Sequence, residues 1–150
     1  MEVHVRTARL TDMDAAVRLL AHGDPDGRAL QQHVTDVLRN LLYVPSATVV
    51  VAERERQVIG VGVLAIRPSV RSGPFVGVID ELGVAELEGA ERRQAADEIV
   101  EALAGSARNK GCTRVEVSEP LASAEPSLWK RLGFASRGRT LNRSLSRSVG

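Results

Sequence analysis

The chain has 150 residues, a length that fits one ordinary domain with a buried core, and we expect a single domain over residues 1–150. Hydrophobic residues make up 43% and charged residues 26%, and a net charge of +1 gives no electrostatic reason to expect nucleic acid or a membrane surface as a partner. No apolar run approaches the roughly 20 residues that span a bilayer, and the N-terminus lacks the apolar core of a signal peptide. The single cysteine, Cys112, excludes an intrachain disulfide, so we expect a cytoplasmic protein.

The first third of the chain predicts a strand followed by two helices. Residues 3–8 are rich in β-branched and apolar residues, which indicates a short strand. Thr11 and Asp14 fit a capping box, in which the Thr11 side chain accepts from the Asp14 N–H at the start of a helix. Apolar residues at helical spacing then predict helices over residues 12–22 and 30–41, separated by a turn rich in glycine and aspartate.

The middle third predicts three consecutive strands joined by short polar connections. β-branched residues dominate them, as expected for strands that are at least half buried. Alternation in the second strand places Gly60 and Gly62 on one face, with Ile59 and Val61 on the other. The three strands are expected over residues 48–52, 58–66 and 75–84.

The last third predicts a long helix, a strand and a short helix. One face of the long helix carries regularly spaced apolar residues, and Gly111 ends it in the usual C-cap position. We expect the next strand over residues 113–118, the short helix over residues 125–132, and one or two strands from Phe134 onward. The complete order, β-α-α-β-β-β-α-β-α-β, predicts an α/β or α+β fold with a mixed sheet and a central antiparallel meander.

Two segments near the end of the chain are distinctive. Residues 111–117 form a strand that leaves the long helix, and residues 128–134 form a short helix ending in Leu-Gly-Phe. With the element order, they resemble the GCN5-related N-acetyltransferase (GNAT) family, which carries acetyl groups from acetyl-CoA to amines. The resemblance covers nearly the whole chain. It implies acetyl-CoA as cosubstrate, a small-molecule or peptide amine as acceptor, and allows a homodimer.

The resemblance gives the end of the third meander strand a catalytic and a binding role. The acidic pair Asp80 and Glu81 matches the family position whose first member often acts as general base through a water. An amine must lose a proton before it attacks a thioester, so a carboxylate within reach is what the chemistry requires. Leu82, Gly83 and Val84 are similar to the positions whose free backbone groups hydrogen-bond the pantetheine arm. The alternative is that one carboxylate caps the strand end and the other is solvated.

The family's pyrophosphate loop, Arg/Gln-x-x-Gly-x-Gly/Ala, opens the long helix and binds phosphate through backbone N–H groups. Residues 91–96 occupy that place by their spacing to the end of the helix, and only Ala96 fits the pattern. Glu91 repels a phosphate, and Gln94 stands where glycine is usual. The resemblance gives phosphate-binding roles to Arg92, Arg93, Gln94, Ala95 and Ala96, with the two guanidiniums contributing through their side chains. The alternative is that this segment is the solvated first turn of a helix.

Trp129 stands where the family has a tyrosine that protonates the departing thiolate. An indole N–H only donates, and it does not supply a proton as a phenol does, so we expect Trp129 to pack or to cover the thioester. The three histidines lack the spacing of metal ligands, and no metal site is expected. The sequence therefore predicts an acetyltransferase-like protein that transfers an acyl group from acyl-CoA to an amine, or a GNAT-fold binding or regulatory module that has lost catalysis.

Overall fold

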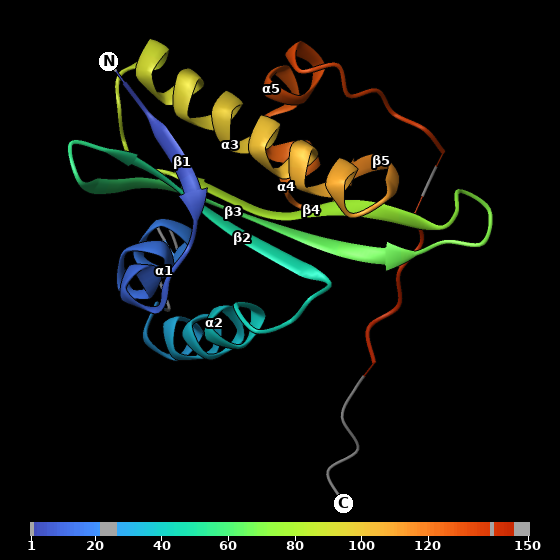
Figure 1. The fold of residues 1–150 in the computed structure, drawn as a ribbon, viewed down its shortest axis with the longest axis horizontal. Coiled ribbons are helices and arrows are strands. Elements are labelled where there is room, and N and C mark those ends of the chain that lie inside the picture. The colour runs from blue at the N-terminus through green and yellow to red at the C-terminus, as the bar shows by residue number, and fades with distance from the viewer. Residues whose placement is uncertain (1, 22–26, 139, 146–150) are drawn as a thin grey trace, which may run out of the picture.

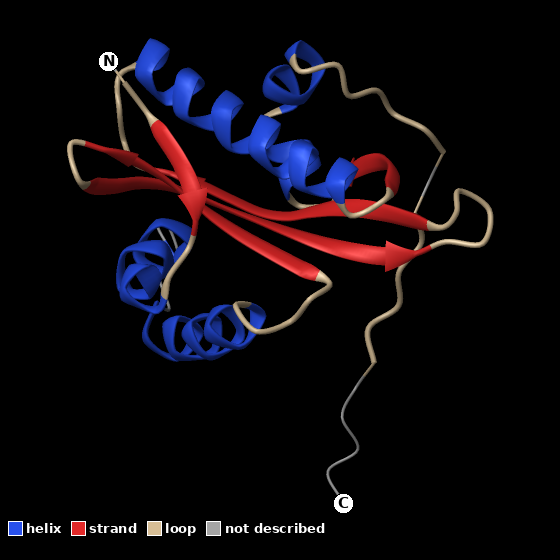
Figure 2. Cartoon of the chain, viewed as in Figure 1, coloured by secondary structure: helices blue, strands red, loops and turns tan. Residues whose placement is uncertain are grey.

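A five-stranded mixed sheet lies between two layers of helices (Figures 1 and 2). The computed structural model describes residues 2–21, 27–138 and 140–145. The elements in chain order are β1 (His4–Thr7), the 3-10 helix η1 (Leu10–Asp12), α1 (Met13–Ala21), α2 (Gly27–Leu41), β2 (Ala47–Arg54), β3 (Gln57–Pro68), β4 (Phe75–Val84), α3 (Gly89–Asn109), β5 (Cys112–Val117), α4 (Leu121–Ala124) and α5 (Pro126–Arg131). The α+β fold with a mixed sheet is therefore confirmed.

The sheet follows the order of the chain, β1-β2-β3-β4-β5. Strands β1 to β4 are antiparallel neighbours, as the predicted meander requires, and β5 runs parallel to β4. Helix α3 makes the crossover between these two parallel strands and crosses one face of the sheet. This crossover brings the start of α3 close to the carboxyl end of β4.

The two faces of the sheet bury separate hydrophobic cores. On one face, α3 and α5 pack through residues such as Ile99, Leu103 and Trp129. On the other face, α1 and α2 pack through residues such as Met13 and Leu38 (Figure 1). The amphipathic spacing that predicted these helices is therefore the spacing that fills the two cores.

Two glycines let α3 lie unusually close to the sheet. A Cβ on Gly60 would lie 2.6 Å from Ile99 Cδ1, and a Cβ on Gly62 would lie 2.5 Å from Ile99 Cγ2. Both glycines thus share the α3 face, as predicted. Ile59 was expected on the opposite face, which is wrong: the register of β3 against β2 shifts at Ala52, and Ile59 joins the core on the α3 side.

An ion-pair network joins β1, η1 and β2 around the buried carboxylate of Asp12. Arg6 donates to both oxygens of Asp12, at 2.7 and 3.0 Å, and its Nε donates to Glu53 at 2.9 Å. The Arg6 guanidinium holds the pKa of Asp12 below its usual range. The helical segment is also capped here, because the Arg9 N–H donates to Asp12 Oδ2 at 2.7 Å. The predicted capping box of Thr11 and Asp14 is therefore wrong, since the acid that caps lies two residues earlier.

The end of the chain differs most from the prediction. Residues 134–138 and 140–145 contain no strand, so the strands expected from Phe134 onward are wrong for this part of the chain. Leu141 and Leu145 are 80% and 86% exposed, and without burial of these side chains the segment has little to hold it against the sheet. A short helix, α4, precedes α5 and was not predicted. The last residue of the predicted helix 12–22 lies outside the described residues.

Candidate functional site

The carboxyl end of β4 leaves its neighbour β5 and offers free backbone groups. The parallel pairing of β4 with β5 ends at Ile79, opposite Val117, whereas the antiparallel pairing with β3 continues to Val84. Asp80 is the extra residue of a bulge, because Val63 pairs with Glu81 and the next residue of β3 pairs with Ile79. Backbone groups alternate between the two sides of a strand, so some of the N–H and C=O groups of residues 80–84 face away from β3, on the side where β5 no longer pairs with β4.

The two faces of this strand end carry different chemistry. Gly83 faces α1, since a Cβ there would lie 3.0 Å from the Leu19 carbonyl oxygen. Glu81 shares that face by alternation, whereas Leu82 and Val84 face α3. Partial desolvation, together with the neighbouring Asp80 charge, raises the pKa of Glu81, although the residue as a whole is exposed. The structure thus brings Asp80 and Glu81 together at the bulge, both accessible from solvent.

An apolar pocket of about 130 Å³ opens between β4, α3 and the short helices α4 and α5. We call it the β4–α5 pocket. Its lining residues are Leu82, Val84, Arg92, Ala96, Leu121, Ala124, Glu125, Leu128 and Trp129. Five of them belong to the predicted site, and together they come from segments that span more than 40 positions of the chain. The pocket suits a narrow chain-like group better than a bulky ring system, because drug-sized ligands occupy about 300–1,000 Å³.

The segment expected to form a phosphate-binding loop is helical. Helix α3 begins at Gly89 with Glu88 as its N-cap, and the Arg92 N–H already donates to the Glu88 carbonyl at 2.9 Å. Residues 91–96 therefore lie within the helix, and from Arg92 onward their backbone N–H groups are used by its own hydrogen bonds. The expectation that they open the helix is wrong. The helix-forming residues of this stretch extend α3 by more than one turn toward the N-terminus.

Most charged side chains of this segment are paired within the protein. Arg92 donates to Glu125 at 2.7 Å, and Arg54 of β2 donates to Glu91 at 2.9 Å. Glu125 raises the pKa of Arg92 through this hydrogen bond. Arg93 is exposed.

The uncharged members of the segment have different surroundings. Ala95 and Ala96 are buried in the core on the α3 side, and Ala96 also reaches the pocket wall. Gln94 is half-buried and interacts within the protein. No local pattern could have shown that Glu125, 33 positions away, would hold Arg92.

Trp129 forms a wall of the β4–α5 pocket and is held in place. Its Nε1–H donates to the Leu121 carbonyl at 2.9 Å, which ties α5 to α4. Its ring packs edge-on against Phe134 with the centroids 5.4 Å apart. The packing role expected for Trp129 therefore fits its surroundings, and its only donor hydrogen is used within the protein.

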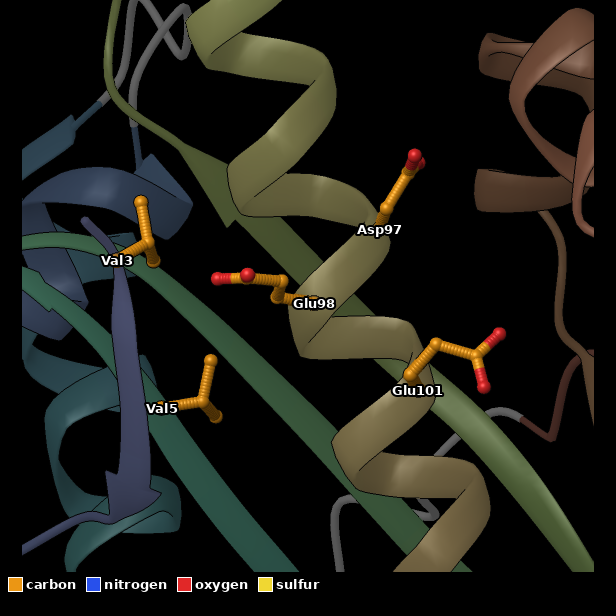
Figure 3. Close-up of a pocket in the computed structure, with 5 residues that line it drawn as sticks. All are labelled: Val3, Val5, Asp97, Glu98 and Glu101. Carbon is orange, nitrogen blue, oxygen red and sulfur yellow. The ribbon is translucent and has the colours of Figure 1, made fainter. Parts of the chain in front are cut away.

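A second hollow, of about 280 Å³, lies on the opposite flank of α3, beside β1 (Figure 3). Val3 and Val5 line it from β1, and the carboxylates of Asp97, Glu98 and Glu101 line it from α3. Of these, Glu98 points toward β1, while Asp97 and Glu101 point away (Figure 3). Although this hollow is the larger, its carboxylates repel phosphate, so the β4–α5 pocket is the better candidate for a CoA-type ligand.

The part of the chain that the structure describes has neither a membrane-spanning helix nor a cluster of metal ligands. No helix there is both long and apolar enough to cross a bilayer. No cluster of three or more His, Cys, Asp or Glu side chains there could hold a metal ion.

Comparisons with known proteins agree with this architecture. A transcriptional regulator from Bacillus halodurans C-125 matches with a TM-score of 0.78 and 17% identity over 96% of this chain and 100% of its own. An aminoglycoside N-acetyltransferase solved with CoA matches with a TM-score of 0.77 and 17% identity, over 96% of this chain and 95% of its own. Glucosamine-6-phosphate N-acetyltransferase from Arabidopsis thaliana matches with a TM-score of 0.75 and 15% identity, over 97% of this chain and 100% of its own. At such identities the likeness shows the fold alone.

Sequence comparison supplies the family. No curated protein sequence matches the chain. The model of the acetyltransferase (GNAT) family matches residues 14–134, which include every predicted site residue, so the chain belongs to the GNAT acetyltransferase family.

Proposed function

We propose that this chain is an N-acetyltransferase that moves an acetyl group from acetyl-CoA to the amine of a small molecule or peptide. The observation that carries the proposal is the end of β4, which is unpaired on its β5 side, lies beside an apolar pocket and bears two carboxylates at its bulge. Membership of the GNAT family supports the reaction. The CoA bound to an aminoglycoside N-acetyltransferase of the same fold supports acetyl-CoA as the cosubstrate.

The donor would bind along β4. The backbone groups of Leu82 and Val84, on either side of Gly83, face away from β3 and match the amides of a pantetheine arm, since an unpaired strand edge offers both donors and acceptors. The apolar walls, including Ala96 and Trp129, would contact its methylene and acyl groups.

The phosphates of the donor would depend on side chains. Backbone N–H groups of residues 92–96 are bonded within α3, so Arg92 and Arg93 are the side chains that we expect to meet the phosphates. Gln94 and Ala95 contribute by holding the helix that carries these arginines. The acidic residues Glu88 and Glu91 at the start of α3 make this end of the site less favourable for phosphate than the pantetheine end.

The reaction requires one proton transfer before the bond changes. Asp80 accepts a proton from the substrate ammonium, directly or through a water. The negative charge of Glu81 attracts the ammonium to the site before this transfer. The neutral amine then attacks the thioester carbonyl carbon, so that a C–N bond forms and the C–S bond breaks. The attacking nitrogen gives its second proton to solvent. CoA leaves as the thiolate and takes up a proton from water, because the Trp129 N–H is already bonded to Leu121.

The single tryptophan of the chain gives a direct binding assay, because Trp129 lines the pocket. We expect acetyl-CoA and desulfo-CoA to change its fluorescence, with calorimetry as an independent measurement. Thiol release with a panel of amines measures turnover. Asp80→Asn should retain donor binding and lose about 10²–10⁴-fold in turnover, the usual contribution of a general base. Absence of binding at millimolar acetyl-CoA would refute the proposal.

The second candidate is a GNAT-fold binding or regulatory module without acetyl transfer. The helical segment that replaces a phosphate loop and the fully engaged Trp129 favour it. Donor binding without thiol release across the amine panel, unchanged in Asp80→Asn, would support this candidate over the enzyme.

A further inference from the structure

The ion pair of Arg92 and Glu125 joins two walls of the β4–α5 pocket. Arg92 comes from α3, and Glu125 immediately precedes α5, with 2.7 Å between the guanidinium nitrogen and the carboxylate oxygen. Both residues line the pocket. Their side chains are 43% and 41% exposed, so ions from solvent have access to the pair.

These two residues set the charge of the pocket. They are the charged members of its lining, and the other lining residues are apolar. While they are paired, the positive charge of Arg92 is largely cancelled by the carboxylate 2.7 Å away. A phosphate that enters meets a strong attraction only if Arg92 exchanges its carboxylate partner for the phosphate.

We propose that Glu125 is a specificity-determining residue of this site: it holds Arg92 when no donor is bound, and the phosphate of the donor displaces it. The inference rests on the proposed function, since it concerns the same donor. Exchange is feasible because exposed ion pairs are weak, whereas a phosphate carries more charge than a carboxylate and accepts two guanidinium hydrogen bonds. Glu125 thereby lowers the affinity for every phosphate-bearing ligand and leaves the pantetheine contacts unchanged.

The test compares two ligands that differ in phosphate. CoA carries the phosphates, and S-acetylpantetheine carries only the pantetheine arm and the thioester. Glu125→Gln should bind CoA about two- to fivefold more tightly than the wild type, the range expected from removing an exposed competing pair. Its affinity for S-acetylpantetheine should not change. Arg92→Gln should weaken CoA binding. In Arg92→Gln, the further change Glu125→Gln should tighten CoA binding by less than it does in the wild type, because it then removes only the repulsion between the carboxylate and the phosphate.

A matched control separates charge from helix packing. Asp97 and Arg131 form another ion pair between α3 and α5, and neither residue lines the β4–α5 pocket. Asp97→Asn therefore removes a similar link between the same helices and should leave the CoA affinity unchanged. Thermal unfolding of each variant reports whether it is folded.

Three results would overturn the inference. Unchanged CoA affinity in Glu125→Gln, with weaker binding in Arg92→Gln, would mean that Arg92 binds phosphate without competition, and the proposed function would stand. Equal tightening for S-acetylpantetheine would mean that Glu125 acts through pocket shape. Absence of binding of both ligands to every form would refute the proposed function itself.

Discussion

Gly62→Ala tests how closely α3 must lie against the sheet to hold the site together. The new Cβ would be 2.5 Å from Ile99 Cγ2 and 3.0 Å from Leu103 Cδ1. Non-bonded carbons prefer about 3.5–4.0 Å, so α3 must move away by about 1 Å or Ile99 must leave its rotamer. Ile99 and Leu103 are both fully buried, so the closely packed core around them resists their movement. Overpacking costs about 1–3 kcal/mol, and we expect Gly62→Ala near the upper end of that range.

Urea unfolding followed by the fluorescence of Trp129 measures the cost, since this tryptophan belongs to the core on the α3 side. A matched control is Gly105→Ala on α3, where a Cβ would meet nothing within 4 Å. Because alanine favours a helix over glycine by about 0.5–1 kcal/mol, the control should be stabilised. The same variants report on the site, since a shift of α3 displaces Arg92 and should weaken CoA binding in Gly62→Ala only.

A second-site change distinguishes crowding from other causes. Ile99→Ala alone should cost about 2–5 kcal/mol, because it removes a buried side chain. In the double variant with Gly62→Ala, the new methyl group occupies part of that space, so the combined cost should be smaller than the sum of the two. A Gly62→Ala protein as stable as the wild type, or a strictly additive double variant, would refute the reasoning.

Three further predictions concern single side chains. Asp12→Ala breaks a mostly buried pair with Arg6, and we expect a loss of about 3 kcal/mol in the free energy of unfolding at neutral pH. The pKa of Asp12 is lowered in the folded state, so the extra stability of the wild type over Asp12→Ala should disappear progressively as the pH falls below about 3.9. If urea unfolding shows that the stability of both proteins falls equally with pH, the pairing is contradicted. The pKa of Glu81 is raised, so its ionisation opposes folding. Glu81→Gln should therefore be as stable as the wild type at pH 4 and more stable at pH 7. A constant difference in the free energy of unfolding between pH 4 and pH 7 would argue against desolvation. Trp129→Phe leaves the Leu121 carbonyl without its donor and should cost about 1 kcal/mol or more in thermal unfolding, whereas an unchanged melting temperature would show that the hydrogen bond contributes nothing.

Local periodicity was sufficient for much of the fold. The apolar residues that predicted the long helix, Ile99 and Leu103 among them, are the ones buried against the sheet. Gly60 and Gly62 lie on one face as the alternation predicted, because a strand fixes the sides of its residues through its own geometry. Asp80 and Glu81 lie together simply because they are consecutive residues near the end of one strand.

Features that depend on partners far along the chain could not be predicted in this way. The bulge at Asp80 and the register shift beside Ile59 arise from the pairing of strands, and neither has a signal within its own strand. The walls that α4 and α5 give to the pocket, and the pairing of Arg92 with Glu125, depend on where the chain returns after β5. The strands expected from Phe134 onward are absent from the described part of that segment, where residues 135–138 and 140–145 are exposed and bury no apolar face.

The early start of α3 changes the physical basis on which this site would recognise a nucleotide. A phosphate loop binds through backbone N–H groups, which carry no net charge and have no internal competitor. Here the N–H groups of residues 92–96 are hydrogen-bonded within α3, and Ala95 gains burial in the core instead. We expect recognition to rest on the guanidiniums of Arg92 and Arg93, whose attraction for phosphate is screened by salt, and Arg92 already has a carboxylate nearby. The affinity for CoA should therefore fall steeply with ionic strength, whereas the affinity for S-acetylpantetheine should hardly change. Equal salt dependence of the two ligands would mean that side-chain charge does not carry the recognition of the phosphates.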